Sequence, residues 1–414
     1  MKNSRIPMAA FLLCMAGGLS ACGALSYSLQ TEEEVVVYEN QEREITLEEL
    51  ESHEEKEMVW NAWEYAFDSL DESEQIWYRD IAQALDTMTD RVRLSEEGFR
   101  AGLDERAVDK IFQYVLNDHP ELFYVEGYSY TKYTRGEKTV AIEFTGTYNA
   151  DRDTVEKKRG EIEQAAGKIV AAMPEADSDY EKVKYAYETL ILQTDYKTEA
   201  PENQNIYSVF VGHESVCQGY AKAFQYLMNC MGVECTLVQG HVKDTGEGHA
   251  WNLVKADGDY YYVDTTWGDI SYQNAEQAEE EDVEENGQSD LTQISYDYLC
   301  ITTDRILRTH EINEDLVMPE CTALEDNYFV REKAYFSEYD KEKLAELIDR
   351  RLAEGAEDIS FCCGDEACYD EMCKALLDDR EIFDYLAGTG INSFVYSNND
   401  KQLTLTFFMV TSAQ

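Results

Sequence analysis

Basic residues are scarce in this chain of 414 residues. Lysine and arginine together number 35, against 85 aspartates and glutamates, so the formal net charge is −50 at pH 7. A surface with this excess of negative charge repels nucleic acid and anionic membrane surfaces, which excludes nucleic acid as an expected partner. The sequence also lacks a D-x-[DN]-x-[DN]-G loop that would indicate calcium binding. We therefore attribute the acidic residues to solubility.

Long apolar runs are absent as well. After a basic start with Lys2 and Arg5, the apolar run Ile6–Gly18 is shorter than the roughly 20 residues that cross a bilayer as a helix. The following residues, LSAC, end at Cys22 and resemble a bacterial lipobox. This resemblance implies a lipoprotein signal peptide over residues 1–22 and an exported protein, anchored by a lipid on Cys22 to the outer face of the cytoplasmic membrane. The alternative is a plain signal peptide that is cut nearby.

Composition and apolar spacing divide the remaining chain into four segments. Residues 23–57 are acidic and polar, as is typical of a tether. Residues 58–173 combine helical apolar spacing with two strand-like runs around a Gly-containing turn, which predicts an α+β domain. Residues 174–324 carry the informative motifs and an acidic loop at 274–290. Residues 325–414 alternate between helix and strand patterns and end in a predicted hairpin, so we expect a second flanking α+β domain.

Cysteines are more numerous than one site requires. Eleven are present, and nine of them lie beyond Cys14 and Cys22. Because nine is odd, we expect one free reactive thiol at Cys217 and eight others that are either paired or simply buried. Those within residues 362–373 have the spacing C-C-x4-C-x4-C, which fits no common set of zinc ligands, so buried thiols are the better interpretation.

The segment SVCQGYAKAF, residues 215–224, places a cysteine where a helix is expected to begin. Ser215 and Gln218 have the S-x-x-Q form of a capping box, and Gly232 is a suitable stop. With Ser215 as the N-cap, Cys217 lies in the first turn, where unpaired N–H groups and the helix dipole lower the pKa of a thiol. The resulting thiolate is a nucleophile. The alternative is that Cys217 only packs against the start of the helix.

The segment GHAWNLVKADGDYYYVDTTWGD, residues 248–269, supplies a candidate base. Two strand-like runs flank Asp257-Gly258, which is typical of a two-residue hairpin turn. With that turn, Asp264 lies opposite Trp251 and is the diagonal neighbour of His249 on the same face, about 7–8 Å away between Cα atoms. A carboxylate placed there can hold one ring nitrogen of an imidazole while the other nitrogen faces a thiol. A slip of one residue would move Asp264 to the opposite face.

The order of S-V-C-Q-G-Y-A, G-H-A-W-N-L-V and Y-Y-V-D-T-T-W-G-D resembles the core of the transglutaminase-like superfamily, over roughly residues 180–310. This resemblance implies a papain-like α+β core in which a cysteine opens a helix that packs on a sheet bearing histidine and aspartate. We therefore expect an α+β fold with α+β flanking domains at both ends. The resemblance assigns Cys217 as nucleophile, His249 as general base and acid, and Asp264 as the group that orients the imidazole.

Further site residues follow from the same resemblance. N-I-Y-S-V-F-V resembles the family's stretch with an aromatic residue near the oxyanion site, which suggests Tyr207. Gln218 and Trp267 are expected to shape the site, although Trp267 also fits a core position. The backbone N–H of Cys217 is a natural oxyanion donor at a helix start. The resemblance implies no metal and no organic cofactor.

The reaction implied by the resemblance is acyl transfer through a thioester. The flanking segments resemble those of exported Firmicutes proteins with a transglutaminase-like domain. We expect a cell-surface cysteine peptidase or amidase that hydrolyses a protein or peptide substrate of the cell envelope. One alternative is a protein-glutamine amine transferase that forms crosslinks. The other is a surface binding module whose triad does not turn over.

Overall fold

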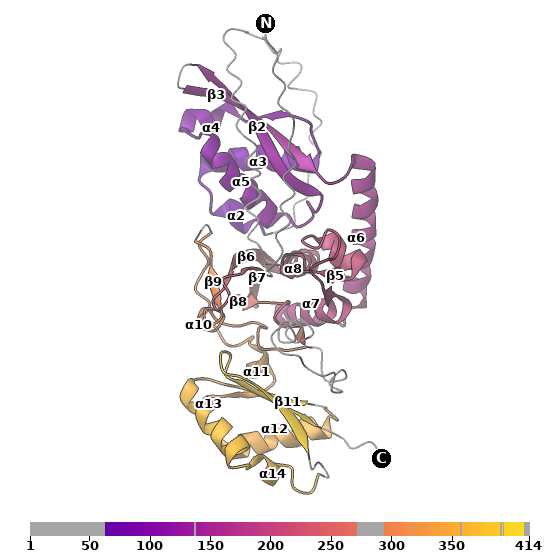
Figure 1. The fold of residues 1–414 in the computed structure, drawn as a ribbon, viewed down its shortest axis with the longest axis vertical. Coiled ribbons are helices and arrows are strands. Elements are labelled where there is room, and N and C mark those ends of the chain that lie inside the picture. Colours follow the sequence, from indigo (N-terminus) through magenta and orange to yellow (C-terminus); the bar gives the residue numbers. More distant parts are fainter. Residues whose placement is uncertain are drawn as a thin grey trace, which may run out of the picture.

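The computed structural model describes residues 63–135, 138–270, 294–314, 316–356, 358–389, 391 and 393–409. Three mixed α and β parts follow one another along the chain, so the α+β class is confirmed (Figure 1). The predicted signal peptide, the tether and the acidic loop at 274–290 lie outside the described residues. Within the described part, no helix combines the length and the apolar character that a membrane span requires.

The N-terminal part packs short helices against an antiparallel sheet. Its elements are α2 (Tyr65–Asp68), α3 (Glu72–Asp86), β1 (Val92–Arg93), α4 (Glu96–Ala101), α5 (Glu105–Asp118), β2 (Val125–Arg135) and β3 (Lys138–Tyr148). The sheet order is β1-β3-β2, and the predicted β2–β3 hairpin is confirmed. A capping box at Asp71 begins α3. Trp77, Phe112 and Phe144 are completely buried and form the centre of this part.

Two helices lead from the N-terminal part into the central part. They are α6 (Arg152–Ala172) and α7 (Asp179–Gln193). The side chain of Asp151 caps α6, and Ser178 begins α7 with a capping box. The hydroxyl of Tyr185 on α7 donates to the carbonyl of Ile169 on α6 over 2.8 Å. In Figure 1, α6 extends along the side of the molecule from the N-terminal part to the central part.

The central part places one long helix against an antiparallel sheet. Its elements are β4 (Asp195–Tyr196), the π-helical η1 (Ser208–Gly212), β5 (Glu214–Ser215), α8 (Cys217–Met231), β6 (Glu234–Val242), β7 (Gly248–Ala256), β8 (Asp259–Val263), α10 (Thr303–Ile306) and β9 (His310–Ile312). The sheet order is β8-β7-β6-β9. Helix α8 packs on this sheet through Ala221, Leu237 and Ala250. The amide of Asn252 on β7 also donates to the carbonyl of Ala221 over 3.0 Å.

The start of α8 differs from the prediction. The N-cap is Val216, whose side chain forms no capping hydrogen bond. The prediction of a capping box formed by Ser215 and Gln218 is therefore wrong. The hydroxyl of Ser215 instead donates to the carbonyl of Asn203 over 2.7 Å, and it lies 2.7 Å from the hydroxyl of Ser208. These contacts therefore engage the hydroxyl oxygen of Ser215 that would otherwise cap the helix. Cys217 is nevertheless the first residue of α8, and Gly232 ends the helix in a left-handed conformation, as predicted.

The β7–β8 hairpin has the predicted register. Ala256 pairs with Asp259, and Asn252 pairs with Val263. Asp257 and Gly258 form the turn with φ angles of 49° and 103°, as a two-residue hairpin turn requires. The pairing of β7 with β8 ends at Val263. Asp264 is therefore the first residue beyond β8 and does not pair with Trp251 as a strand residue.

The C-terminal part is a second sheet covered by helices. Its elements are α11 (Tyr328–Arg331), β10 (Tyr335–Phe336), α12 (Lys341–Ala353), β11 (Asp358–Cys363), α13 (Glu366–Cys373), the π-helical η2 (Lys374–Asp378), α14 (Ile382–Tyr385), β12 (Phe394–Asn399) and β13 (Thr404–Met409). The sheet order is β10-β11-β13-β12. The guanidinium of Arg305 joins this part to the central part, because it donates to the carbonyls of Gln402 over 2.7 Å and Gly364 over 3.1 Å.

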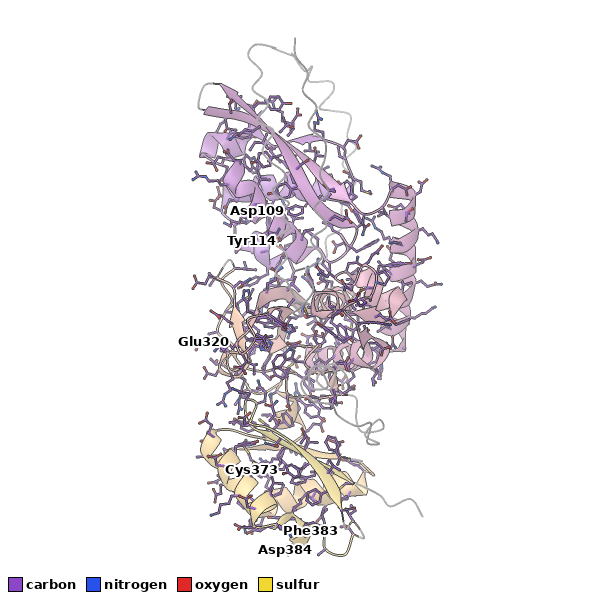
Figure 2. The ribbon with its side chains drawn as sticks, in the orientation of Figure 1. Asp109, Tyr114, Glu320, Cys373, Phe383 and Asp384 are labelled. Carbon is purple, nitrogen blue, oxygen red and sulfur yellow. The ribbon has the colours of Figure 1, made fainter. Side chains whose placement is uncertain are left out.

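The thiols of the C-terminal part are unpaired and mostly buried. Cys362, Cys363 and Cys368 are buried, and Cys373 is half-buried among the side chains of this part (Figure 2). The sulfur of Cys363 lies 3.5 Å from that of Met372. These contacts fit apolar packing of thiols, as the sequence predicted.

Candidate active site

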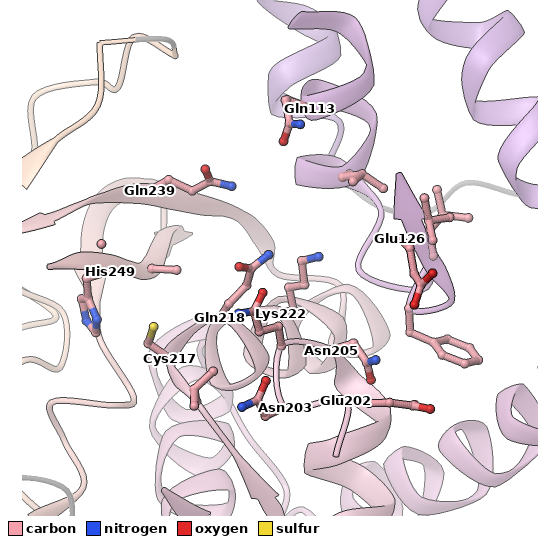
Figure 3. A pocket seen from close by; sticks show the side chains of 18 of the residues that line it. Gln113, Glu126, Glu202, Asn203, Asn205, Cys217, Gln218, Lys222, Gln239 and His249 are labelled. Atoms are coloured by element: carbon pink, nitrogen blue, oxygen red, sulfur yellow. The ribbon is translucent and has the colours of Figure 1, made fainter. Parts of the chain in front are cut away.

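Cys217 and His249 line one cavity of about 560 Å³ in the central part. Cys217 opens α8, and His249 lies near the start of β7. In Figure 3 the sulfur of Cys217 points toward the imidazole of His249. Their side chains are almost buried, with exposed fractions of 3% and 5% for the two residues. The packing of α8 on β6 and β7 therefore brings together a sulfur and an imidazole that the sequence placed on separate elements.

The oxidation state of the cysteines differs from the expectation. Cys217 is disulfide-bonded in the structure, which corrects the prediction of a free thiol at this position. The other eight cysteines of the described part are free, and Cys230 among them is exposed, so the expectation that these eight are paired or buried is wrong for Cys230. A thiol at a helix start ionises readily, and thiolates exchange into disulfides. The chemistry considered below is therefore that of reduced Cys217.

Asp264 holds the imidazole of His249. The Nε2 of His249 lies 2.7 Å from Oδ2 of Asp264, and both side chains are buried. The sequence predicted that the two residues are neighbours, and the structure shows a direct hydrogen bond. When Nε2–H donates to the carboxylate, Nδ1 is left as the acceptor that a thiol proton requires.

The carboxylate of Asp264 is itself fixed by its surroundings. Its Oδ1 accepts hydrogen bonds from the backbone N–H groups of Thr266 and Trp267, each over 3.0 Å. Burial alone would raise the pKa of Asp264, but the hydrogen bond from His249 and the close imidazoles of His249 and His310 outweigh burial and hold the pKa well below its usual range. Asp264 is therefore an anion that can orient and stabilise an imidazolium.

His310 is a second imidazole at this carboxylate, and the sequence reasoning missed it. It opens β9, and its Nε2 lies 3.2 Å from Oδ2 of Asp264. This contact is close but is not aligned as a hydrogen bond. Its Nδ1 lies 2.8 Å from the hydroxyl of Thr309. Burial lowers the pKa of His310, which favours the neutral ring. No local motif marks this histidine, because only the pairing of β9 with β6 brings it to Asp264.

The same three side chains are the group among the described residues that could hold a metal ion. The ligating atoms of His249, Asp264 and His310 lie within 4.8 Å of one another. Two ligands of a tetrahedral zinc ion are about 3.3 Å apart, given zinc–ligand bonds of about 2.0–2.1 Å. The 2.7 Å between His249 and Asp264 is shorter and is a hydrogen-bond distance. The arrangement therefore fits a hydrogen-bonded pair better than a metal centre.

Two tryptophans enclose the imidazoles. The ring of Trp251 stacks on that of His249 with centroids 5.8 Å apart. The ring of Trp267 lies 6.1 Å from His249 and 4.7 Å from His310. These aromatic walls keep water away from the hydrogen bond between His249 and Asp264. Trp267 packs against both imidazoles but does not line the cavity, so its site-shaping role stays a prediction.

The other two predicted site residues have different positions. Gln218 lines the cavity together with Cys217, and its role in shaping the site stays a prediction. Tyr207 does not line it, because its hydroxyl donates to Glu161 over 2.8 Å and its ring lies 4.6 Å from the ammonium of Lys158. Tyr207 immediately precedes η1, which packs against α6. The placement of Tyr207 near the oxyanion site is therefore not supported.

The N-terminal part supplies a wall of the cavity that the sequence analysis did not predict. Gln113 and Leu116 on α5, together with Phe123 and Glu126, line the cavity opposite α8. Helix α5 is held there by Asn117, whose amide donates to the carbonyl of Leu237 and whose carbonyl accepts from the amide of Gln225, each over 2.9 Å. These partners are more than 100 residues apart in the chain, so no local sequence signal could have revealed them.

Comparisons with known proteins agree with the geometry of the central part. Residues 167–265 match the family model of the transglutaminase-like superfamily. Over 111 aligned residues the chain is 30% identical to the kyphoscoliosis peptidase of Mus musculus and 28% identical to that of Homo sapiens. Each alignment covers 23% of this chain, which spans 17% of the length of those relatives.

A solved structure is similar to part of the chain. It is that of a candidate cysteine protease from Cytophaga hutchinsonii, with 10% identity, coverage of 33% of this chain and 61% of that chain, and a TM-score of 0.23. The segment matched by the family model contains Cys217, His249 and Asp264. Within its α+β fold, this chain therefore contains a segment, residues 167–265, that is similar to the transglutaminase-like superfamily.

Proposed function

We propose that this protein is a cysteine enzyme that hydrolyses a peptide or amide bond. The observation that supports this most directly is a cavity lined by both Cys217 and His249, in which His249 is held from behind by Asp264. A nucleophile, a base and an orienting acid arranged in this order are what acyl transfer to a cysteine requires.

Each side chain has a distinct role in the proposed reaction. Reduced Cys217 transfers its proton to Nδ1 of His249, and the thiolate attacks the carbonyl carbon of the substrate. The backbone N–H at the start of α8 and the amide of Gln218 are the proposed donors to the oxyanion. His249 then returns the proton to the departing amine, which leaves a thioester on Cys217. His249 next takes a proton from water, the hydroxide displaces the sulfur, and a carboxylic acid and the thiol are released.

The composition of the cavity favours water over an amine as the acceptor. Its lining includes the polar side chains of Gln113, Asn149, Asn203, Gln239 and Asn313. Such walls hold water through hydrogen bonds, whereas a dry apolar channel would be needed to keep water from the thioester. Crosslinking by amine transfer and binding without turnover are therefore the alternative outcomes of the experiment below.

The proposed substrate is a protein or peptide of the cell envelope. This follows from the expected export and the expected lipid on Cys22, which would hold the enzyme at the outer face of the cytoplasmic membrane. Replacement Cys22→Ala should release the protein from the membrane fraction of cells. Retention of the Cys22→Ala variant in that fraction would contradict the anchor.

A thiol-reactive peptide probe tests the proposed nucleophile. After reduction with dithiothreitol, the probe should label the wild type and should not label the Cys217→Ala variant at this site. Equal labelling of the two proteins would reject Cys217 as the reactive thiol. Mass spectrometry after incubation with a glutamine-containing peptide and a labelled primary amine then separates the reactions. Hydrolysis without an amine adduct supports the proposal, an adduct supports amine transfer, and binding without turnover supports a binding module.

A further inference from the structure

Lys222 lies in the same cavity as the proposed nucleophile. It belongs to α8, one helical turn after Gln218, so both side chains project from the same face of the helix. Both residues line the cavity together with Cys217 and His249. Figure 3 shows the side chains of Gln218 and Lys222 next to each other at the cavity. A substrate bound in this cavity therefore lies near an ammonium group.

No described side chain neutralises this ammonium group. The pKa of Lys222 is lowered to about 8 by burial, and no neighbouring carboxylate acts against that effect. Solvent still reaches part of the side chain, as expected at the floor of a cavity. Lys132 and Lys197 differ in this respect, since each forms an ion pair with a glutamate.

The acidic residues that line the cavity do not neutralise the ammonium group of Lys222 either. The carboxylate of Glu202 accepts a hydrogen bond from Lys158 and is already paired. Glu126 is exposed on β2, on the wall contributed by the N-terminal part, and forms no ion pair with Lys222 in the described structure. Among the described residues, this half-buried lysine has no carboxylate partner, although the chain has 85 acidic residues. Such an ammonium group is suited to an anion from outside the fold.

We propose that Lys222 forms a subsite for a carboxylate of the substrate, close to the bond that Cys217 attacks. This proposal rests on the proposed function and specifies its substrate class as acidic peptides or amides. The ammonium of Lys222 provides the positive charge that binds this carboxylate, while the amide of Gln218 remains the proposed donor to the oxyanion. The carboxylate comes either from an acidic side chain or from the end of a peptide chain. The preference that such a partly hydrated ion pair provides is about tenfold.

The reach of the subsite can be measured without knowledge of the substrate. Three iodoacetyl acids, made from glycine, β-alanine and γ-aminobutyrate, place a terminal carboxylate at increasing distance from the carbon that alkylates a thiol. Each is compared with its neutral primary amide. A further pair, iodoacetyl-glutamate amide and iodoacetyl-glutamine amide, presents an acidic side chain instead. Mass spectrometry gives the rate of Cys217 alkylation in the reduced full chain at pH 7, divided by the rate for N-acetylcysteine.

The expected result is that one acid of the series alkylates Cys217 about tenfold faster than its amide. Lys222→Met should abolish this preference, and Lys222→Arg, which keeps the charge, should retain it. Lys157→Met is the matched control, because it removes the same charge from an exposed side chain on α6. Thermal unfolding identifies variants that do not fold, and Lys222→Gln then replaces Lys222→Met. The best probe reports whether the terminal or the side-chain carboxylate is bound.

Two outcomes overturn the subsite. One is an equal ratio of acid to amide rates in the wild type and in Lys222→Met at every probe length. The other is an equal slowing of both members of each pair in Lys222→Met, since Lys222 would then act only on the thiolate of Cys217. In both cases Cys217 is alkylated, so the proposed nucleophile stands. If no probe alkylates reduced Cys217, the proposed function fails and the subsite fails with it.

Discussion

Two buried pairs of aspartate and histidine lie in different parts of this molecule. In the central part, Asp264 binds His249 beside the cavity. In the N-terminal part, Asp118 and His119 follow one another at the end of α5. Asp118 accepts hydrogen bonds from the backbone N–H groups of Ala66 and Phe67, each over 2.9 Å. It also accepts one from the hydroxyl of Tyr78 over 2.8 Å.

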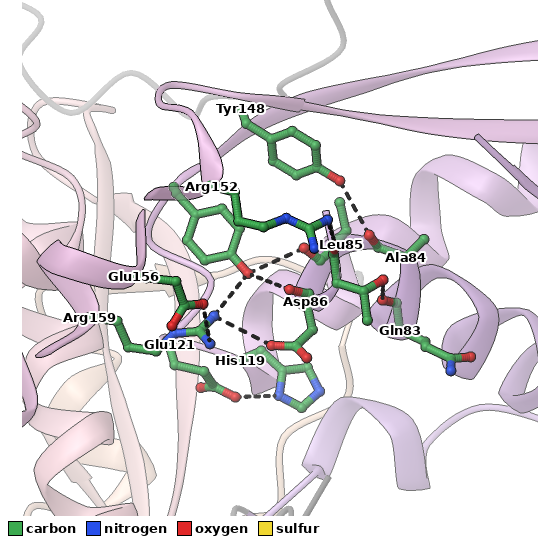
Figure 4. Close-up of polar contacts among 12 residues, drawn as sticks. Gln83, Ala84, Leu85, Asp86, His119, Glu121, Tyr148, Arg152, Glu156 and Arg159 are labelled. Atoms are coloured by element: carbon green, nitrogen blue, oxygen red, sulfur yellow. Dashed lines mark hydrogen bonds and ion pairs between the residues drawn. The ribbon is translucent and has the colours of Figure 1, made fainter. Parts of the chain in front are cut away.

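Both ring nitrogens of His119 already have a polar partner. Its Nε2 lies 3.0 Å from the hydroxyl of Tyr78, and its Nδ1 lies 3.0 Å from the carboxylate of Glu121. Figure 4 shows the contact between His119 and Glu121 beside the ion pair of Arg159 and Asp86. His119 does not line the cavity, whereas His249 does. A buried aspartate and histidine become a candidate for catalysis only where one ring nitrogen is left for a nucleophile.

The two aspartates also differ in the direction of their pKa shifts. Burial raises the pKa of Asp118 to about 6, despite its hydrogen bonds from the backbone and from Tyr78. The pKa of Asp264 is lowered instead, because two imidazoles outweigh its burial. The N-terminal pair therefore favours a proton, and the central pair favours a negative charge.

The largest expected effect is on turnover. Asp264→Ala should lower kcat by about 10²–10⁴-fold, because the imidazole of His249 loses the group that sets its tautomer and stabilises its charge. The measurement is hydrolysis of a peptide that the wild type cleaves. Asp118→Ala is the matched control in the other pair and should leave kcat of the folded enzyme within about twofold. Equal losses of kcat in the two variants would remove the distinction between the pairs.

The next effect is on stability and belongs to the N-terminal pair. Asp118→Ala leaves the N–H groups of Ala66 and Phe67 and the hydroxyl of Tyr78 without their acceptor in the interior. We expect a loss of about 3 kcal/mol in the free energy of unfolding, measured by urea denaturation. Asp109→Ala, on the same helix but nearer the surface, should cost less than about 1 kcal/mol. A cost below 1 kcal/mol for Asp118→Ala would show that these hydrogen bonds do not stabilise the N-terminal part.

A third prediction concerns the pH dependence of stability. The folded state binds a proton on Asp118 more tightly than the unfolded state, so its contribution to stability should fall as pH rises from about 4 to about 6. Asp264 acts in the opposite direction: its contribution is present above about pH 4 and is lost as pH falls below that value. Melting temperatures from pH 3 to pH 7 of the wild type, Asp118→Asn and Asp264→Asn test both signs.

The expected change for Asp118→Asn is a flatter profile between pH 4 and pH 6, with a slope reduced by at most about 1.4 kcal/mol per pH unit. For Asp264→Asn, the profile should be flatter below pH 4 only. If both variants flatten the same region of the profile, the two aspartates do not differ as described.

The smallest effect is expected at His310, which we regard as a positioning residue. His310→Phe keeps a buried ring but removes the imidazole that contacts Asp264. We expect kcat to fall about tenfold while KM stays unchanged, because the orientation of His249 changes and no substrate contact is lost. His310→Gln, which keeps a polar group, should restore part of kcat. A fall in melting temperature with normal kcat would assign His310 a purely structural role.

Sequence reasoning succeeded where short-range rules apply. The Asp257-Gly258 turn and the alternation of side chains fixed the pairing of β7 with β8, which places Asp264 just beyond the strand end. The periodicity of residues 217–231 likewise located α8, with Gly232 at its end. Sequence reasoning failed for the capping box of Ser215. The hydroxyl of Ser215 contacts Ser208 and Asn203 instead, and no helix-capping motif indicates these two partners.

The amino-acid sequence by itself determined the helix that carries Cys217 and the hairpin that carries His249, because turn chemistry and apolar periodicity act between residues that are close in the chain. Only the tertiary structure decided that His310 reaches Asp264, that α5 forms a wall of the cavity, and that no carboxylate in the described part of the chain pairs with Lys222. Those features depend on contacts between segments that are far apart in the chain. Such contacts depend on how whole helices and strands pack together, and no pattern among neighbouring residues in the sequence indicates that packing.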